Sequence, residues 1–284
     1  MGEKVLMKGN EAIGEAAIRS GCRHFFGYPI TPQTELSAYM AKKMPKINGV
    51  FLQAESEVSA INMVYGAAAA GMRAMTSSSS PGISLKAEGI SYLAAGDLPC
   101  VIVNIVRGGP GLGGIQPAQS DYFQAVKGGG HGDYHLIVLA PNSVQEFAYL
   151  TAEAFNISDE YRIPTMILGD GTLGQMMEPV DLDAIPEPIY ADKPWAAIGT
   201  DNKRKKNVVE TLYLEASELE KKVLEREEKY NVVKENLQRY EAHDIDDADI
   251  IISSYGITSR VVETAVKSLR EEGIKVGVIR PITL

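Results

Sequence analysis

Short apolar runs alternate with amphipathic stretches through residues 5–180, and this alternation constrains the possible folds more than any other feature of the chain. Residues 101–106 form an uncharged run rich in Val and Ile, which is typical of a strand buried on both faces of a parallel sheet. Residues 57–70 have the length and apolar spacing of a helix instead. Repeated strand and helix patterns of this kind predict an α/β fold, with a mainly parallel sheet and helices on both faces.

The same patterns place individual elements along the chain. We expect helices at residues 10–19 and 57–70, and strands at residues 24–28, 50–54, 74–77, 101–106, 136–140 and 165–168. Asn10 has the residue type of an N-cap for the first helix, and Gly21 is expected to stop it. Pro29 and Pro32 predict a rigid turn after strand 24–28, because proline can continue neither a strand nor a helix there.

The composition changes after about residue 201. Residues 201–243 contain ten Lys/Arg and ten Asp/Glu, and their apolar side chains follow a narrow helical stripe that Arg226 interrupts. We expect a short antiparallel hairpin or a helix that lies on a partner. A strand at 249–253, a helix at 258–270 that Gly273 stops, and a parallel strand at 275–279 come next.

These patterns divide the chain into residues 1–195, a charged helical linker at 196–246, and the start of another α/β domain at 247–284. A single βαβ unit cannot bury both faces of its sheet. Either partners complete this unit or the sequence is a truncated version of a longer polypeptide, and we favour truncation.

The composition also excludes several classes of function. A formal net charge of −9 argues against binding to nucleic acid or to an anionic membrane, because both need clustered Lys and Arg. The apolar runs are too short for a membrane span and the first residues lack a signal-peptide core, so we expect a cytoplasmic protein. Cys22 and Cys100 alone cannot build a cluster site, and the histidines lack metal-ligand spacing, so any electron carriers must lie on other subunits.

Three loops follow the carboxyl ends of predicted parallel strands, where open α/β sheets bind ligands: residues 28–34, 55–57 and 107–114. Arg107 is the one cation in a long apolar and glycine-rich stretch, and its guanidinium fork matches a carboxylate. The alternative is that it pairs with an acid of the protein such as Asp121.

The other two loops carry a hydroxyl and a carboxylate. Thr31 could bind a ligand or could simply stabilise its proline-rich turn. Glu57 could complement the dipole of the helix it begins, or share a proton with a ring nitrogen if it lies in an apolar pocket.

Three further motifs are interpreted as structural. Residues 109–114 satisfy GxGxxG, but the prolines around them oppose the helix that a dinucleotide site requires. Asp170 lies in a Gly-Asp-Gly turn without the Asn-Asn pair that completes a thiamine diphosphate metal motif. Residues 77–80 are four serines without a local histidine, and we interpret them as hydroxyls and amides at a helix N-terminus, suited to polar ligand atoms or to a subunit contact.

Several motifs in the same order resemble one enzyme family, the alpha-type subunits of 2-oxoacid:ferredoxin oxidoreductases. They are GYPITP at 27–32, QAESE at 53–57, TSSSSPG at 76–82, RGGP at 107–110 and GGGHG at 128–132. The similarity covers residues 8–180 and resumes at 251–284. The amino-acid sequences of three longer stretches, residues 52–71, 76–100 and 125–141, are most similar to the subunits that act on 2-oxoisovalerate (3-methyl-2-oxobutanoate).

The resemblance implies that residues 1–195 are the pyrimidine-binding domain of a thiamine diphosphate enzyme, and that a transketolase C-terminal-like domain begins near residue 247. It assigns Glu57 to the aminopyrimidine N1′, and Thr31 and Arg107 to the carboxylate and carbonyl of the 2-oxoacid. Tyr28, Pro29 and Ile30 would line the cofactor site.

The resemblance further implies a hetero-oligomeric enzyme, expected to be a dimer of hetero-oligomers. Magnesium and the diphosphate would be held by a beta-type subunit, and iron–sulfur clusters by that subunit and a ferredoxin-like one. A gamma-type subunit completes the assembly, which would convert a 2-oxoacid and coenzyme A to acyl-CoA and CO2 while reducing an external ferredoxin. The alternatives are the same chemistry on 2-oxoglutarate or pyruvate, or a non-catalytic scaffold.

Overall fold

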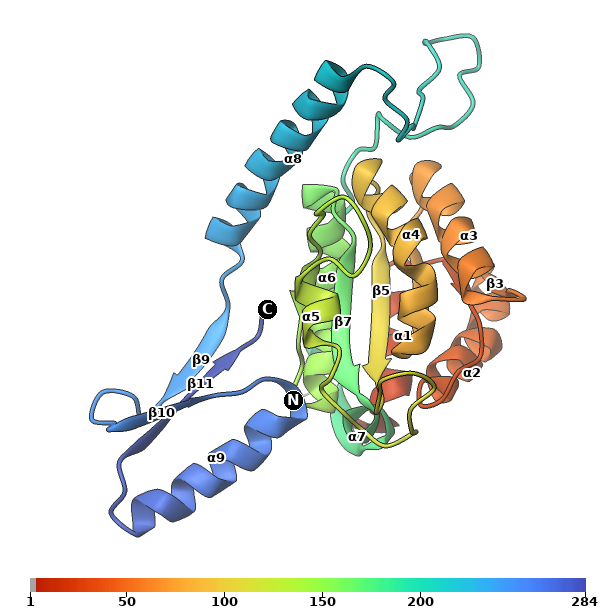
Figure 1. The fold of residues 1–284 in the computed structure, drawn as a ribbon. Helices are drawn as coiled ribbons and strands as arrows, with labels where there is room; N and C mark the ends of the chain where they lie inside the picture. The colour runs from red at the N-terminus through yellow and green to blue at the C-terminus, as the bar shows by residue number, and fades with distance from the viewer. Residues whose placement is uncertain (1–3) are drawn as a thin grey trace.

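Six parallel strands form the central sheet of the protein, in the order β3-β2-β4-β5-β7-β6. Strands β5 and β7 of this sheet lie between α4 and α6 in Figure 1. The computed structural model describes residues 4–284. The sheet strands are β2 (His24–Gly27), β3 (Val50–Gln53), β4 (Ala74–Ser78), β5 (Val101–Val106), β6 (Ile137–Leu139) and β7 (Thr165–Asp170). All six lie within two residues of the predicted strands, and the predicted α/β fold is confirmed.

Helices cover both faces of this sheet. One face packs against α1 (Gly9–Arg19), α2 (Thr34–Lys43) and α6 (Val144–Tyr161), and the other against α3 (Glu57–Ala69) and α4 (Pro81–Ala95). Strand β5 shows why: its alternate side chains Val101, Val103 and Ile105 belong to the first core and Ile102 to the second, as the two-residue period of a strand requires. Burial of both sets fixes the register of the strand.

The first helix begins differently from the prediction. Asn10 is not the N-cap, because α1 starts at Gly9 and Lys8 is its cap residue. The Asn10 side chain is fully buried, and its Nδ2 donates to the backbone oxygen of Pro32 at 2.9 Å. A buried tertiary hydrogen bond has replaced the expected local one, and it ties α1 to the proline turn after β2.

Smaller elements complete this part of the chain. They are β1 (Lys4–Lys8), which pairs antiparallel with β8 (Met177–Asp181), the short helices α5 (Tyr122–Val126) and α7 (Gly171–Gln175), and the 3-10 turns η1 (Met44–Ile47) and η2 (Leu182–Ala184).

The charged region contains one helix, α8 (Ala216–Asn236), and not the predicted hairpin. Residues 201–215 form no helix, and four consecutive cations that repel one another lie among them at 203–206. Of the residues of α8, only Tyr230 is buried. The prediction that this helix lies on a partner is not tested by the structure.

A second, three-stranded sheet follows in the order β10-β11-β9, with one helix (Figure 1). Its elements are β9 (Tyr240–His243), β10 (Ile250–Ser253), α9 (Gly256–Glu271) and β11 (Val276–Pro281). The βαβ unit is as predicted, whereas β9 was wrongly included in the helical stripe. Antiparallel pairing with β11, which lies far along the chain, makes it a strand. None of the helices in residues 4–284 combines the length and apolar character needed to cross a membrane.

Candidate functional site

The three predicted ligand-binding loops lie at one edge of the central sheet. Strands β3, β2, β4 and β5 are parallel neighbours, so their carboxyl ends meet at the same edge. Thr31 follows β2, Glu57 follows β3, and Arg107 follows β5. The serine run, residues 77–80, includes the last two residues of β4 and lies between them. The fold therefore gathers at one edge the side chains that sequence reasoning had selected separately.

Arg107 is held by backbone oxygens and not by a carboxylate. Its side chain is buried, and its two terminal nitrogens donate to the backbone oxygens of Thr31 and Leu112, each at 3.0 Å. Its Nε is buried without a hydrogen-bond partner in the described residues. The alternative pairing with Asp121 is wrong, because Asp121 accepts a hydrogen bond from Asn104 Nδ2 at 3.0 Å instead.

A strained turn at Ser80 connects β4 to the Arg107 backbone. Ser80 has a φ of 21°, which non-glycine residues rarely adopt. Its backbone N–H donates to Asn104 Oδ1 at 3.1 Å, and its Oγ accepts the backbone N–H of Arg107 at 3.1 Å. Asn104 is fully buried in the middle of β5. These hydrogen bonds hold the turn in its strained form and fix the start of α4.

Glu57 is buried at the start of α3, with 5% of its surface exposed. Ser56 caps the helix by accepting the Ser59 N–H at 3.2 Å. The carboxylate lies over Gly82 of α4, where an added Cβ would lie 2.8 Å from Glu57 Oε1 and 2.0 Å from Ser78 Oγ. The missing side chain of Gly82 thus makes room for a carboxylate and a hydroxyl side by side. Of the serine run, Ser80 is the cap residue of α4 as the sequence predicted, whereas Ser77 and Ser78 belong to the end of β4.

The loop after β2 is fixed by a residue that the sequence did not reveal. Gln33 is fully buried, and it donates from Nε2 to the backbone oxygen of Tyr28 at 3.2 Å and accepts from Ser77 Oγ at 2.6 Å. Within this loop Tyr28 and Ile30 are half-buried, while Pro29 and Thr31 are exposed. The loop therefore presents its surface beside the buried Arg107.

Two motifs interpreted as structural behave as predicted. Residues 107–117 fold into a closed loop without a helix, with Gly108 N bonded to Gln116 O at 2.8 Å and Gly114 N to Gly108 O at 2.9 Å. Asp170 caps α7 by accepting the N–H groups of Thr172 and Leu173. Burial raises the pKa of Asp170 above its ordinary value, against these lowering hydrogen bonds.

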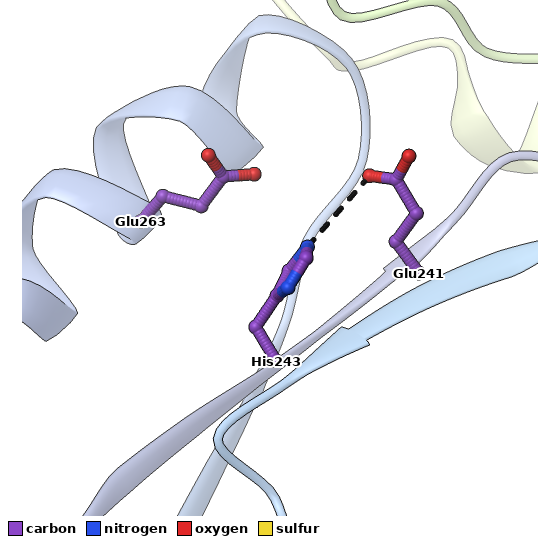
Figure 2. Close-up of side chains that lie close together, drawn as sticks. All are labelled: Glu241, His243 and Glu263. Atoms are coloured by element: carbon purple, nitrogen blue, oxygen red, sulfur yellow. Dashed lines mark ion pairs between the residues drawn. The ribbon is translucent and has the colours of Figure 1, made fainter.

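A second group of titratable residues lies between strand β9 and helix α9 in the C-terminal part of the chain (Figure 2). Glu241, His243 and Glu263 bring possible metal-ligating atoms within 4.8 Å of one another. Glu241 is already paired with the guanidinium of Arg280, whose Nε lies 2.9 Å from it. Because Arg280 already pairs with Glu241 and the His243 side chain is exposed, we assign no function to this cluster.

A cavity of about 630 Å³ lies between α8, the end of β11 and the β6 edge of the central sheet. Its lining includes Tyr230, Tyr240 and Leu284 but none of the predicted site residues. The candidate site is therefore the sheet edge and not the cavity.

Two family profiles match the chain. Residues 15–256 match the family described as "Pyruvate flavodoxin/ferredoxin oxidoreductase, thiamine diP-bdg". Residues 248–284 match "Pyruvate:ferredoxin oxidoreductase core domain II".

Named relatives and a solved structure agree with these profiles. The chain is 52% identical to ketoisovalerate oxidoreductase subunit VorB of Methanothermobacter marburgensis over 98% of its own length and 79% of that protein. It is 37% identical to 2-oxoglutarate synthase subunit KorA of Methanothermobacter thermautotrophicus, over 99% of its own length and 81% of that protein. A 2-oxoglutarate:ferredoxin oxidoreductase from Magnetococcus marinus, solved with 2-oxoglutarate, coenzyme A and succinyl-CoA bound, matches with a TM-score of 0.88 and 31% identity. That match covers all of this chain and 54% of the solved one.

Proposed function

Because the chain belongs to the thiamine diphosphate-binding 2-oxoacid:ferredoxin oxidoreductases, we propose that it supplies the aminopyrimidine-binding half of an active site that oxidatively decarboxylates 2-oxoisovalerate. The observation that carries this proposal is the burial of Glu57 at the sheet edge that also holds Thr31 and Arg107. The chain spans about half of the solved relative, so the activity of the complete enzyme is part of the proposal.

The side chains at the sheet edge fit an aminopyrimidine. The Ser78 and Ser79 hydroxyls are buried without hydrogen-bond partners in residues 4–284, and Ser78 Oγ lies beside the Glu57 carboxylate. A polar heterocycle needs this combination, a carboxylate for a ring nitrogen and hydroxyls for the remaining donors and acceptors. The cofactor, when bound, would supply a carbon nucleophile for the keto group and a cationic ring as a sink for the electron pair released with CO2.

In the proposed enzyme Glu57 shares a proton with the ring nitrogen N1′. Its burial keeps water away from this hydrogen bond, which strengthens the interaction in a medium of low dielectric constant. Tyr28, Pro29 and Ile30 form the adjoining wall in this proposal.

Arg107 and Thr31 bind the 2-oxoacid in the same proposal. The unpaired Nε–H of Arg107 is suited to a substrate carboxylate, since an unsatisfied buried donor gains most from an anionic acceptor. The exposed Thr31 hydroxyl is available for the neighbouring carbonyl.

The loop after Arg107 favours an apolar substrate. It presents the exposed side chains Leu112 and Ile115, and no second Lys or Arg lies between Arg107 and Asp121. A 2-oxoacid with a second carboxylate, such as 2-oxoglutarate, would require another cation. The 52% identity to a ketoisovalerate oxidoreductase subunit supports the same choice.

The rest of the assembly is proposed from the family. Named relatives are subunits, and we propose that a beta-type subunit holds magnesium and the diphosphate, with a gamma-type and a ferredoxin-like subunit completing a cytoplasmic enzyme. Iron–sulfur clusters on those partners would pass electrons to an external ferredoxin, and coenzyme A would accept the acyl group.

The test is the Glu57→Gln variant, assembled with its partner subunits. We expect the rate of 2-oxoisovalerate decarboxylation to fall by at least about tenfold, because the amide cannot share a proton with N1′. Glu55→Gln is the matched control, since Glu55 is an exposed carboxylate two residues away. An unaltered rate in Glu57→Gln would remove this residue from the mechanism. Initial rates with a panel of 2-oxoacids identify the substrate.

A further inference from the structure

A buried lysine lies in the contact between α3 and α4, directly behind the candidate site. Gly82, Lys86 and Gly89 are spaced by four and three residues, so they lie on one face of α4. This face packs on α3, because a Cβ added at Gly82 would meet Glu57 and one added at Gly89 would lie 2.4 Å from Ile61 Cγ2. Lys86 lies between these two points of close approach.

The Lys86 ammonium is fully buried and lacks a hydrogen-bond partner within residues 4–284. Burial lowers the pKa of Lys86 to about 8, and the negative charge of Glu57 opposes this fall. Glu57 is the charged side chain that acts on it, although the two do not form a direct ion pair. Lys86 and Glu57 therefore interact electrostatically without a direct contact, and Glu57 is the one that faces the candidate site.

Packing alone does not account for a charge at this position. Methionine has a similar length, and in the α3–α4 contact it would fill the same space without the cost of desolvating an ammonium. Buried polar groups are normally hydrogen-bonded, so an unpaired ammonium needs another explanation.

We propose that Lys86 is a positioning residue for Glu57, acting as the positive counter-charge behind its carboxylate inside the buried site. The proposal rests on the proposed function. In it, Lys86 biases the proton shared by Glu57 and the pyrimidine toward N1′, without touching the cofactor or the substrate.

The charge coupling can be measured on the full chain without activity. In protein labelled with ¹³C-lysine, the Cε resonance of Lys86, assigned by its loss in Lys86→Met, is followed as a function of pH. The wild-type protein should give a midpoint near 8, and Glu57→Gln should lower this midpoint because the stabilising negative charge is gone. Glu55→Gln should leave it unchanged. An identical midpoint in the wild-type and Glu57→Gln proteins overturns the proposal.

The consequence for the reaction is measured on the assembled complex. Lys86→Met should lower kcat by about tenfold with little change in the KM of the 2-oxoacid, a smaller effect than loss of a general acid or base. Its melting temperature should equal or exceed that of the wild type, since the buried charge is removed. Lys46→Met, which removes an exposed lysine, is the control for loss of a positive charge.

The possible results separate the two proposals. A Lys86→Met complex with wild-type kcat, in an enzyme that turns over 2-oxoisovalerate, overturns the role of Lys86 and leaves the proposed function intact. A lower melting temperature with unchanged kcat assigns Lys86 to packing and likewise overturns its role. If the wild-type complex turns over none of the 2-oxoacids, the proposed function fails, and the coupling of Lys86 to Glu57 is still decided by the titration.

Discussion

At the scale of single residues, Arg107 combines a structural role with a proposed binding role. Two of its N–H groups hold the backbone oxygens of Thr31 and Leu112, which come from two different loops. Because the guanidinium is planar and rigid, these two hydrogen bonds also fix the direction of the Nε–H group. The donor left for a substrate is therefore oriented before the substrate arrives.

Lysine at position 107 should bind substrate poorly while keeping the positive charge. An ammonium has no planar fork, so Arg107→Lys loses both loop contacts and the oriented Nε–H. We expect the KM of the 2-oxoacid to rise by about ten- to a hundredfold, which corresponds to a charged hydrogen bond of about 1.5–3 kcal/mol. Steady-state kinetics of the assembled complex measures it. Arg204→Lys, in the exposed linker, is the control, and an unchanged KM would exclude Arg107 from carboxylate binding.

Whether a site residue could be predicted from the sequence depended on the residues next to it along the chain. Arg107 could be selected because it is the one cation in a long apolar and glycine-rich stretch, and Glu57 because it begins a predicted helix after an apolar strand and matches the family motif. Gln33, Asn104 and Lys86 could not, because their roles arise from contacts across strands and helices. A polar residue in the middle of a strand, such as Asn104, was the one available signal.

At the scale of elements, the α3–α4 contact depends on small residues. Gly89 lets the helices approach until Ile61 lies against its Cα, and Gly82 does the same for Glu57. The separation of these helices sets the depth of Glu57 below the sheet edge. Side-chain volume on α4 should therefore control both stability and the site.

Alanine at Gly89 should destabilise the protein. The added Cβ would lie 2.4 Å from Ile61 Cγ2, so the helices must separate, at a cost of about 1–3 kcal/mol. Gly66→Ala is the matched control, since an added Cβ there meets nothing within 4 Å and should stabilise α3 by about 0.5–1 kcal/mol. Urea unfolding followed by circular dichroism gives both values. Equal stability in the two variants would show that the α3–α4 contact can expand freely.

Local sequence patterns predicted the positions of helices and strands well. They did not predict which strands pair when the partners lie far apart along the chain. Strand β5 is a continuous uncharged run rich in Val and Ile, and helix α3 has the apolar spacing of a helix; both were found within one residue. Strand β9 was missed because its partner β11 lies about forty residues away along the chain, and pairing at that distance leaves no local pattern. The charged region was predicted to be helical and contains helix α8, but the alternative of an antiparallel hairpin is wrong.

At the scale of the whole molecule, one buried arginine joins the C-terminal sheet to the central domain. Arg280 of β11 is fully buried and donates to both oxygens of Glu146 on α6 at 2.8 Å, and to Glu241 of β9 at 2.9 Å. The backbone continues this junction, with Ala140 N bonded to Ile282 O at 2.8 Å. The guanidinium of Arg280 and this backbone junction thus both hold the two sheets together.

Removing this guanidinium should loosen the C-terminal sheet and leave the central sheet intact. Arg280→Met keeps the apolar contacts but leaves Glu146 and Glu241 without their cation, and breaking such a pair costs several kcal/mol when it is fully buried. Both acids are partly exposed here, so we expect a smaller loss of about 1–3 kcal/mol. Hydrogen exchange should accelerate in β9, β11 and α9 while β4 and β5 stay protected.

Arg260→Met provides the control for this experiment, because it removes a more exposed pair between α9 and Glu178 and should cost less than about 1 kcal/mol. If Arg280→Met accelerated exchange in the central strands equally, the two sheets would unfold as one cooperative unit. The buried guanidinium would then be part of a common core, and the position of the C-terminal sheet would not depend on it alone.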